Sequence, residues 1–279
     1  MASQETRPEV CATAGPRMHA IARLGQMVLS RGYELRHVAA IIGAMTWVGV
    51  QPGSWGRAAR NALARQILAI GVEPLLFVFG LAAIVGMAVV GQLAFWTGAA
   101  GQSQLLGPLL VAVVARELGP ILINIVVIIR SGSVMATELG IMKTDRKILD
   151  AGARGIGSLT SLILPRVVGA AVSTLCLTVV FILVAFASGY LCGAWLGTGS
   201  RNFWFFTDTV VHSIRPHDAI GILAKSVLPS LFTAASCCIG GLGAGGAVTA
   251  IPQATQRALT RSVAGLFVIS AVVSLLTYL

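Results

Sequence analysis

The chain has 279 residues, of which 56% are apolar and only 11% are charged, and its mean hydropathy is +0.85. Soluble domains are about 45–50% apolar and about 25% charged, so this composition excludes a soluble globular protein and indicates an all-α integral membrane protein. The net charge of +10 does not indicate a nucleic-acid-binding protein, because the basic residues flank apolar stretches instead of gathering on one polar domain.

The first 70 residues are polar or mixed in character. Residues 1–17 lack periodicity and the apolar core of a cleavable signal peptide, so we expect them to be disordered. Residues 18–70 alternate apolar patches with arginines, and the stretch WGRAARNALARQIL has one polar helical face. This pattern favours an amphipathic helix in the headgroup plane, anchored by Trp47 and Trp55, over a surface helix packed on the protein.

Five apolar stretches are long enough to cross a bilayer, for which roughly 20 residues suffice. We expect spans at residues 71–96, 104–130, 162–196, 218–240 and 262–279. Sixteen Lys and Arg residues fall before the first span, between the second and third, or before the fifth, and two fall on the opposite side. By the positive-inside rule, the N-terminus is cytoplasmic and the C-terminus lies on the outer side.

The second span carries two adjacent charges. Arg116 and Glu117 sit near its middle, where a charge costs from about 2.5–3.5 kcal/mol to far more, so both are functional candidates. Gly119 and Pro120 follow directly, and the proline is expected to kink the helix beside the charges.

A third intramembrane charge, Lys225, lies within the fourth span at a depth similar to that of Glu117. With Arg116, the two residues would form a net-positive cluster. Two interpretations remain open: a brace between helices, because intramembrane charges usually pair inside a bundle, or the polar lining of a cavity for a lipid headgroup. The sequence shows no Ser/His/Asp set and no paired carboxylates that would support catalysis, so an enzyme is not expected.

Several smaller sequence motifs concern helix packing and nucleotide binding. Two overlapping GxxxG motifs at Gly189, Gly193 and Gly197 favour close helix packing over an outer end without a partner. The residues GLGAGG at 241–246 formally match GxGxxG, but no predicted strand precedes them, so a dinucleotide site is rejected. No Walker A motif occurs, and the chain therefore cannot be its own ATPase.

The sequence gives no support for a metal site. His212 and His217 are not spaced as ligands on one helical face. The cysteines have no metal-ligand spacing and are expected to be free, buried thiols; they are Cys11, Cys176, Cys192, Cys237 and Cys238.

Three motifs carry a resemblance to a known family: RELGP at 116–120, ATELGIMK at 136–143 and LPRVVGA at 164–170. In this order and spacing, from about Gln66 to the C-terminus, the chain resembles the MlaE/YrbE family, the permease subunits of MCE-associated lipid ABC transporters. The resemblance implies a permease domain over residues 71–279 that moves phospholipid or another hydrophobic molecule.

The resemblance also implies partners and a location. It predicts a homodimer in the bacterial inner membrane, joined by a cytoplasmic ABC ATPase, an MCE-domain protein on the periplasmic side and a small STAS-type cytoplasmic subunit. ATP and Mg²⁺ would bind the ATPase, and no cofactor is expected in this chain. The polar segment 138–152 would be the cytoplasmic coupling helix that docks on the ATPase, with Glu138, Leu139, Gly140, Met142 and Lys143 as its candidate contact residues.

This segment departs from the family pattern. Family members usually carry an acidic residue followed by Gln where this chain has Arg146 and Lys147, and an Asp where it has Leu149. The departures reverse the local charge, so the partner contacts remain open.

Two alternatives belong to other functional classes. An ion-driven secondary transporter would use Glu117 as its titrating group and would show inverted repeats of its spans, which we do not find in the sequence. A structural membrane anchor would need no transport path.

Overall fold

The computed structural model describes residues 57–99, 106–145, 158–195, 212, 216–243 and 248–278. Nearly all of them are helical, and all belong to one unit of the chain, Ile42–Leu279. Several sequence predictions concern residues that the structure does not describe. They are the disorder expected for residues 1–17, the anchoring role of Trp47 and Trp55, the free thiol of Cys11, and the charge-reversed positions Arg146, Lys147 and Leu149.

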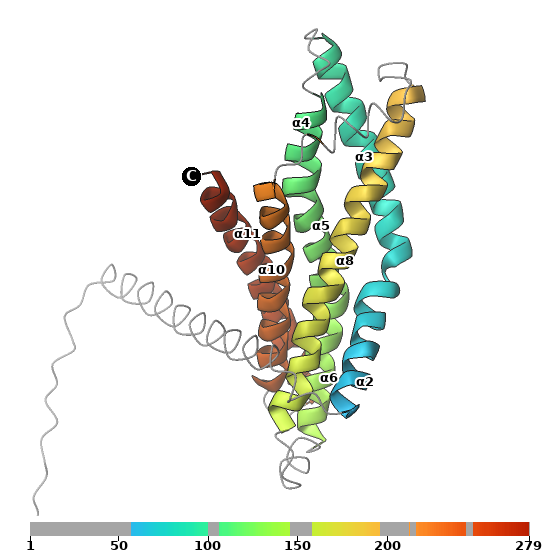
Figure 1. The fold of residues 1–279 in the computed structure, drawn as a ribbon. Helices are drawn as coiled ribbons and strands as arrows, with labels where there is room; N and C mark the ends of the chain where they lie inside the picture. The colour runs from blue at the N-terminus through green and yellow to red at the C-terminus, as the bar shows by residue number, and fades with distance from the viewer. Residues whose placement is uncertain are drawn as a thin grey trace, which may run out of the picture. The chain divides into compact units, whose positions relative to one another are not determined.

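Among the described residues, five helices are long and apolar enough to cross a membrane, which confirms the predicted number of spans. They cover Arg60–Thr97, Gly107–Thr144, Ile163–Trp195, His217–Gly243 and Ile251–Thr277. Figure 1 shows the helices running side by side, with the chain direction alternating from one to the next.

The regular elements are, in chain order, α2 (Arg57–Ile67), η2 (Leu68–Val72), α3 (Leu75–Ala99), α4 (Leu106–Leu110), η4 (Val111–Leu118), α5 (Gly119–Val127), η5 (Ile128–Gly132), α6 (Ser133–Thr144), α8 (Ser158–Trp195), α10 (Pro216–Gly243), η6 (Val248–Ala250) and α11 (Ile251–Tyr278). The elements η2, η4 and η5 are π-helical turns that interrupt the first and second membrane helices, and η6 is a short 3-10 turn.

The first helix begins earlier than predicted. Helix α2 continues through η2 toward α3, and its inner side packs on α8, where Gln66 lies against Gly169. No Gly or Pro interrupts Arg57–Ala69, so the helix propagates until Glu73 and Pro74. The structure therefore continues this segment into the first span, and a separate helix in the headgroup plane is not confirmed.

The second helix ends later than predicted. It continues through η5 and α6 to Thr144, and its 38 residues span about 57 Å at 1.5 Å per residue, compared with about 30 Å of hydrocarbon. No proline follows Pro120 before Thr144, and Gly132 keeps right-handed helical dihedrals. The described part of the predicted coupling segment is therefore the protruding end of the second helix, not a separate helix.

The fifth helix also starts before its predicted limit. Helix α11 begins at Ile251 instead of residue 262, because its polar first turns bury Ala258 against Gly240 of α10. The apolar stretch alone could not reveal that the preceding polar residues are helical.

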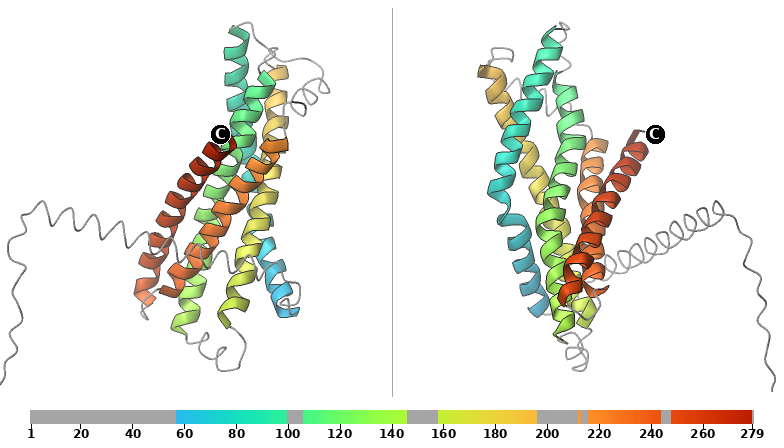
Figure 2. Two further views of the ribbon diagram at one scale, coloured as in Figure 1. Left: turned by 60° about the vertical axis from the view of Figure 1, so that its left-hand side comes forward. Right: turned by 180° about the vertical axis from the view of Figure 1, so that it is seen from behind.

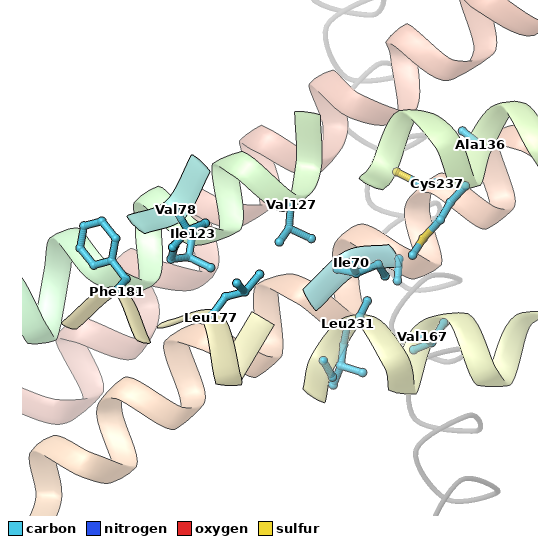
Figure 3. Close-up of a cluster of buried hydrophobic side chains, with 14 of the residues drawn as sticks. Ile70, Val78, Ile123, Val127, Ala136, Val167, Leu177, Phe181, Leu231 and Cys237 are labelled. Atoms are coloured by element: carbon cyan, nitrogen blue, oxygen red, sulfur yellow. The ribbon is translucent and has the colours of Figure 1, made fainter. Parts of the chain in front are cut away.

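Helices α8 and α10 form the centre of the bundle. Helix α8 packs along α3 and α10, and α10 in turn packs along α11. The apolar core between them includes Leu177 and Phe181 of α8, Leu231 of α10 and Ile123 of α5 (Figure 3). Figure 3 shows Ile123 near Leu177 and Phe181, so this part of the core packs α5 against α8.

Helices α3 and α8 approach each other closely at two glycines. A methyl group at Gly86 would overlap the backbone of Ala185, and one at Gly189 would overlap the side chain of Val90. Gly193 has no neighbour within 4 Å of such a methyl group, and Gly197 lies outside the described residues. The GxxxG prediction therefore holds for Gly189 and not for Gly193.

The four described cysteines are free, as predicted. Cys237 and Cys238 are buried in α10, whereas Cys176 is exposed on α8 and differs from the expected burial.

Candidate functional site

Four charged side chains meet where α10 begins. We call Arg116, Glu117, Asp218 and Lys225 the intramembrane charge cluster. In Figures 1 and 2, the upper ends of α10 and α11 lie below the upper ends of α3, α4 and α8. We call this end of the bundle the outer end, and the opposite end, which contains α6, the inner end. Arg116 lies ten residues after Leu106, so the cluster sits about 15 Å along the second helix, beside the outer ends of α10 and α11.

The predicted pair between the second and fourth spans is formed. The Lys225 ammonium contacts the Glu117 carboxylate directly, and it also donates to the Arg116 backbone carbonyl at 3.1 Å. The hydroxyl of Ser274, on α11, donates to the same Glu117 oxygen at 3.0 Å. The Lys225 side chain is 4% exposed and that of Glu117 is 36% exposed, so the carboxylate is the accessible member of the pair.

Arg116 has a partner that the sequence did not reveal. Its guanidinium contacts the carboxylate of Asp218 at 2.7 Å, and the Asp218 side chain is fully buried. His217 Nε2 lies 3.1 Å from the second oxygen of Asp218. Asp218 therefore adds a second carboxylate to the three charges that the sequence predicted.

The charged groups open onto a small pocket. It is a shallow recess with an enclosed volume of only about 10 Å³, and Arg116, Asp218, Gly221, Ile222, Lys225 and Thr277 line it. Three of the four cluster residues therefore reach the pocket. Among the described residues, no three His, Cys, Asp or Glu side chains come together as a metal site.

The π-helical segment η4 explains how adjacent residues reach different partners. It ends at Leu118, and the Gly119 amide donates to the Val114 carbonyl five residues earlier. A wider helical turn therefore precedes Pro120, and the kink expected at Gly119 and Pro120 stays a prediction. Such π turns occur often at functional sites. Here Arg116 contacts α10, while Glu117 contacts both α10 and α11.

The candidate coupling residues divide into two groups at the inner end of the bundle. Leu139 and Gly140 are buried, and Gly140 packs against Ile251 of α11. Glu138 and Lys143 are exposed, and Met142 is half-buried. Ile141, which was not among the predicted contact residues, is exposed beside them. Only this second group can face a docked protein while the bundle keeps its packing.

Two polar contacts tie α6 to its neighbours. The Glu138 carboxylate accepts from the Arg166 guanidinium of α8 at 2.9 Å. Lys143 donates to the Leu242 carbonyl, which lies in the last turn of α10, where a cation is favourable near the helix C-terminus. A displacement of α6 would therefore act on both α8 and α10.

Comparison with known proteins identifies the family. The family model Permease MlaE matches residues 63–276, which is most of the chain. The chain belongs to the MlaE permease family. This confirms the resemblance drawn from the three sequence motifs.

Individual relatives are more distant. The chloroplastic protein TRIGALACTOSYLDIACYLGLYCEROL 1 of Arabidopsis thaliana is 30% identical over 191 residues, 68% of this chain and 54% of that protein. The intermembrane phospholipid transport system permease protein MlaE of Haemophilus influenzae is 29% identical over 51% of this chain and 55% of that protein. A probable ABC transporter permease protein of Synechocystis is 25% identical over 76% of this chain and 80% of that protein. The chain spans about half the length of the first two of these relatives.

Proposed function

We propose that this MlaE-family permease is the membrane subunit of an ABC transporter that moves phospholipid or another hydrophobic molecule. The observation that carries the proposal is the intramembrane charge cluster, where two cations and two carboxylates meet beside a pocket in an otherwise apolar bundle. The H. influenzae relative bears the name of a phospholipid transport permease, which supports the substrate class.

The chemistry of the cluster suits a lipid headgroup. A phospholipid carries a phosphate, and a guanidinium and an ammonium are the side chains that bind phosphate most strongly. Arg116 and Lys225 both line the pocket, and Arg116 is 20% exposed. A headgroup amine could pair with the accessible Glu117 carboxylate. The acyl chains would remain in the apolar surroundings of α10 and α11.

The driving force would come from a separate chain. In our proposal a cytoplasmic ATPase binds ATP and Mg²⁺ and docks on the exposed residues of α6, while this chain holds no cofactor. The contacts of Glu138 and Lys143 with α8 and α10 would carry the movement of α6 to the cluster. Glu138 thus acts inside the subunit, not as a docking contact alone.

The remaining partners rest on family membership. We propose that two copies of the permease work together in the bacterial inner membrane with N-termini in the cytoplasm and C-termini in the periplasm. An MCE-domain protein would receive or supply lipid on the periplasmic side, and a small STAS-type subunit would bind in the cytoplasm.

Purification from the host tests this assignment. The tagged permease, extracted in mild detergent, should bring down an ATPase chain, and mass spectrometry should detect phospholipid in amounts comparable to the permease. An extract containing the permease alone, with no ATP hydrolysis after reconstitution in vesicles, would contradict the assignment.

A further inference from the structure

Two prolines remove one backbone hydrogen bond from each of the helices that form the cluster. Proline has no N–H, so the carbonyl four residues before it loses its α-helical donor. Pro229, inside the α-helix α10, removes the donor for the Lys225 carbonyl. Pro120 likewise has no N–H to donate to the wider turn η4, which contains Arg116. The Lys225 carbonyl is buried, where an unpaired acceptor is costly, and the Arg116 carbonyl is partly buried.

Each of these carbonyls receives a side-chain donor from the opposite helix. The Lys225 ammonium, on α10, donates to the Arg116 carbonyl at 3.1 Å. The Asn124 side-chain amide, on α5, donates to the Lys225 carbonyl at 3.2 Å and to the Pro120 carbonyl at 2.8 Å. The two proline-containing segments therefore lie next to each other, and a side chain of each helix donates to a backbone carbonyl of the other. For the Lys225 carbonyl, this donor replaces the N–H that Pro229 lacks.

We infer that Asn124 is a positioning residue for Lys225. Its amide replaces the N–H missing at Pro229 and fixes the α10 backbone at the residue whose ammonium must reach Glu117 and the Arg116 carbonyl. Asn124 does not line the pocket and is only 1% exposed, so it acts through Lys225 and not by touching a ligand.

A purely local role for Asn124 would be a bond to its own helix. The hydroxyl of Ser226 on α10 makes such a contact, since it donates at 2.7 Å to the Ile222 carbonyl four residues earlier. Asn124 differs because its amide also reaches a carbonyl on another helix, at the residue that carries the cluster cation. Ser226, which is also buried, is thus a matched control.

A double-mutant cycle of Asn124 and Pro229 tests the hydrogen bond from Asn124 to the Lys225 carbonyl without any transport assay. Asn124→Leu should lower the thermal stability of the permease in nanodiscs, because it leaves the Lys225 carbonyl without a donor. Pro229→Ala supplies the missing N–H, so Asn124→Leu should be much less damaging in that background. If Asn124→Leu lowers thermal stability equally in the wild-type and Pro229→Ala backgrounds, Asn124 and Pro229 are not coupled and the inference is overturned.

A second measurement reads the position of Lys225 itself. The chain has three lysines, Lys143, Lys147 and Lys225, so mass spectrometry can follow each one during reductive methylation with formaldehyde. Lys225 should be protected in the wild type, and its methylation should rise about fivefold or more in Asn124→Leu, as the loss of one buried hydrogen bond implies. The double variant Asn124→Leu/Pro229→Ala should restore protection, whereas Ser226→Ala should leave it intact.

The relevance to transport rests on the proposed function and is read separately. Phospholipid bound to the purified transporter should fall in Asn124→Leu and recover with Pro229→Ala. Unchanged protection of Lys225 in Asn124→Leu would overturn the positioning role. A wild-type complex that holds no phospholipid would instead overturn the proposed function, and the stability cycle and lysine protection would still decide the role of Asn124.

Discussion

At the scale of single residues, the cluster is held by a balance of charges. An ion pair away from water is stabilised only if both partners remain, and removing one partner of a fully buried pair costs about 3–5 kcal/mol. Asp218 is fully buried, whereas Arg116 and Glu117 are partly exposed. The buried members thus fix the geometry, and the exposed members are the ones that a headgroup can reach.

Two substitutions at the Arg116–Asp218 pair should change lipid preference in opposite directions. Asp218→Asn removes a negative charge and should raise the share of anionic phospholipid bound from an equimolar mixture of anionic and zwitterionic lipids. Arg116→Gln removes a positive charge and should lower that share. Mass spectrometry of lipids retained by the permease in nanodiscs measures the share of anionic phospholipid for each variant. If that share changes in the same direction in both variants, a charge-based preference is excluded.

The sequence revealed three of the four cluster residues and not the fourth. Arg116, Glu117 and Lys225 stand out because each interrupts an apolar stretch. Asp218 lies at the start of the fourth span, where a carboxylate is ordinary at a helix N-terminus. Its burial arises because α10 begins beside Arg116, about a quarter of the way along the second helix. This depends on tertiary packing and has no signal in the local sequence.

At the scale of helices, α6 connects the inner end of the bundle to three neighbours. Its polar contacts reach α8 and α10, and Gly140 packs on Ile251 of α11. A bulky residue at Gly140 would therefore disturb packing inside the subunit, and an uncoupling phenotype from such a change would not report on ATPase docking.

A cleaner test of docking compares Ile141 with Leu139. Ile141 is half exposed, so Ile141→Glu should leave the permease folded but reduce lipid-dependent ATP hydrolysis by the reconstituted complex. Leu139 is fully buried, and Leu139→Ala should lower the free energy of unfolding by about 2–5 kcal/mol. If Ile141→Glu retains full ATPase coupling, the exposed face of α6 is not the docking surface.

The contact between α3 and α8 gives a second prediction at this scale. Gly86→Ala should destabilise the permease by about 1–3 kcal/mol, because the added methyl overlaps the backbone of Ala185. Gly80→Ala on the same helix has no neighbour within 4 Å and should be neutral or slightly stabilising. Thermal unfolding in one detergent compares the two, and similar midpoints would contradict the close packing.

Helix number could be predicted from hydropathy, and helix limits could not. Apolar length identifies spans, but the polar residues of α2, of α6 and of the first turns of α11 are helical because they pack on neighbouring helices. A window that follows only hydrophobicity stops at the membrane surface and misses these extensions. The same limitation caused α6 to be predicted as a separate helix.

At the scale of the whole molecule, orientation decides which end meets the ATPase. The inner end contains α6, the start of α8 and the contact of Lys143 with α10, and the charge cluster lies toward the opposite end. The distribution of basic residues predicts that the inner end is cytoplasmic.

Cysteine labelling in whole cells checks this orientation. In a background without the native cysteines, Lys143→Cys should react with a membrane-impermeant maleimide only after the cells are opened. Arg201→Cys should react in intact cells. Labelling of both positions from the same side would contradict the five-span topology.

Replacement of the Glu117–Lys225 pair tests directly whether the intramembrane charge cluster binds phospholipid headgroups. Glu117→Leu/Lys225→Met removes both charges together, so no charge of the pair is left unpartnered and the protein should stay folded. Native mass spectrometry of the purified complex then counts phospholipids bound per permease. The double variant should lose only the stability of the bond from Lys225 to the Arg116 carbonyl, but it should hold clearly fewer phospholipids and transport slowly. A variant that is stable, fully loaded with phospholipid and fully active would show that the pair only braces the helices.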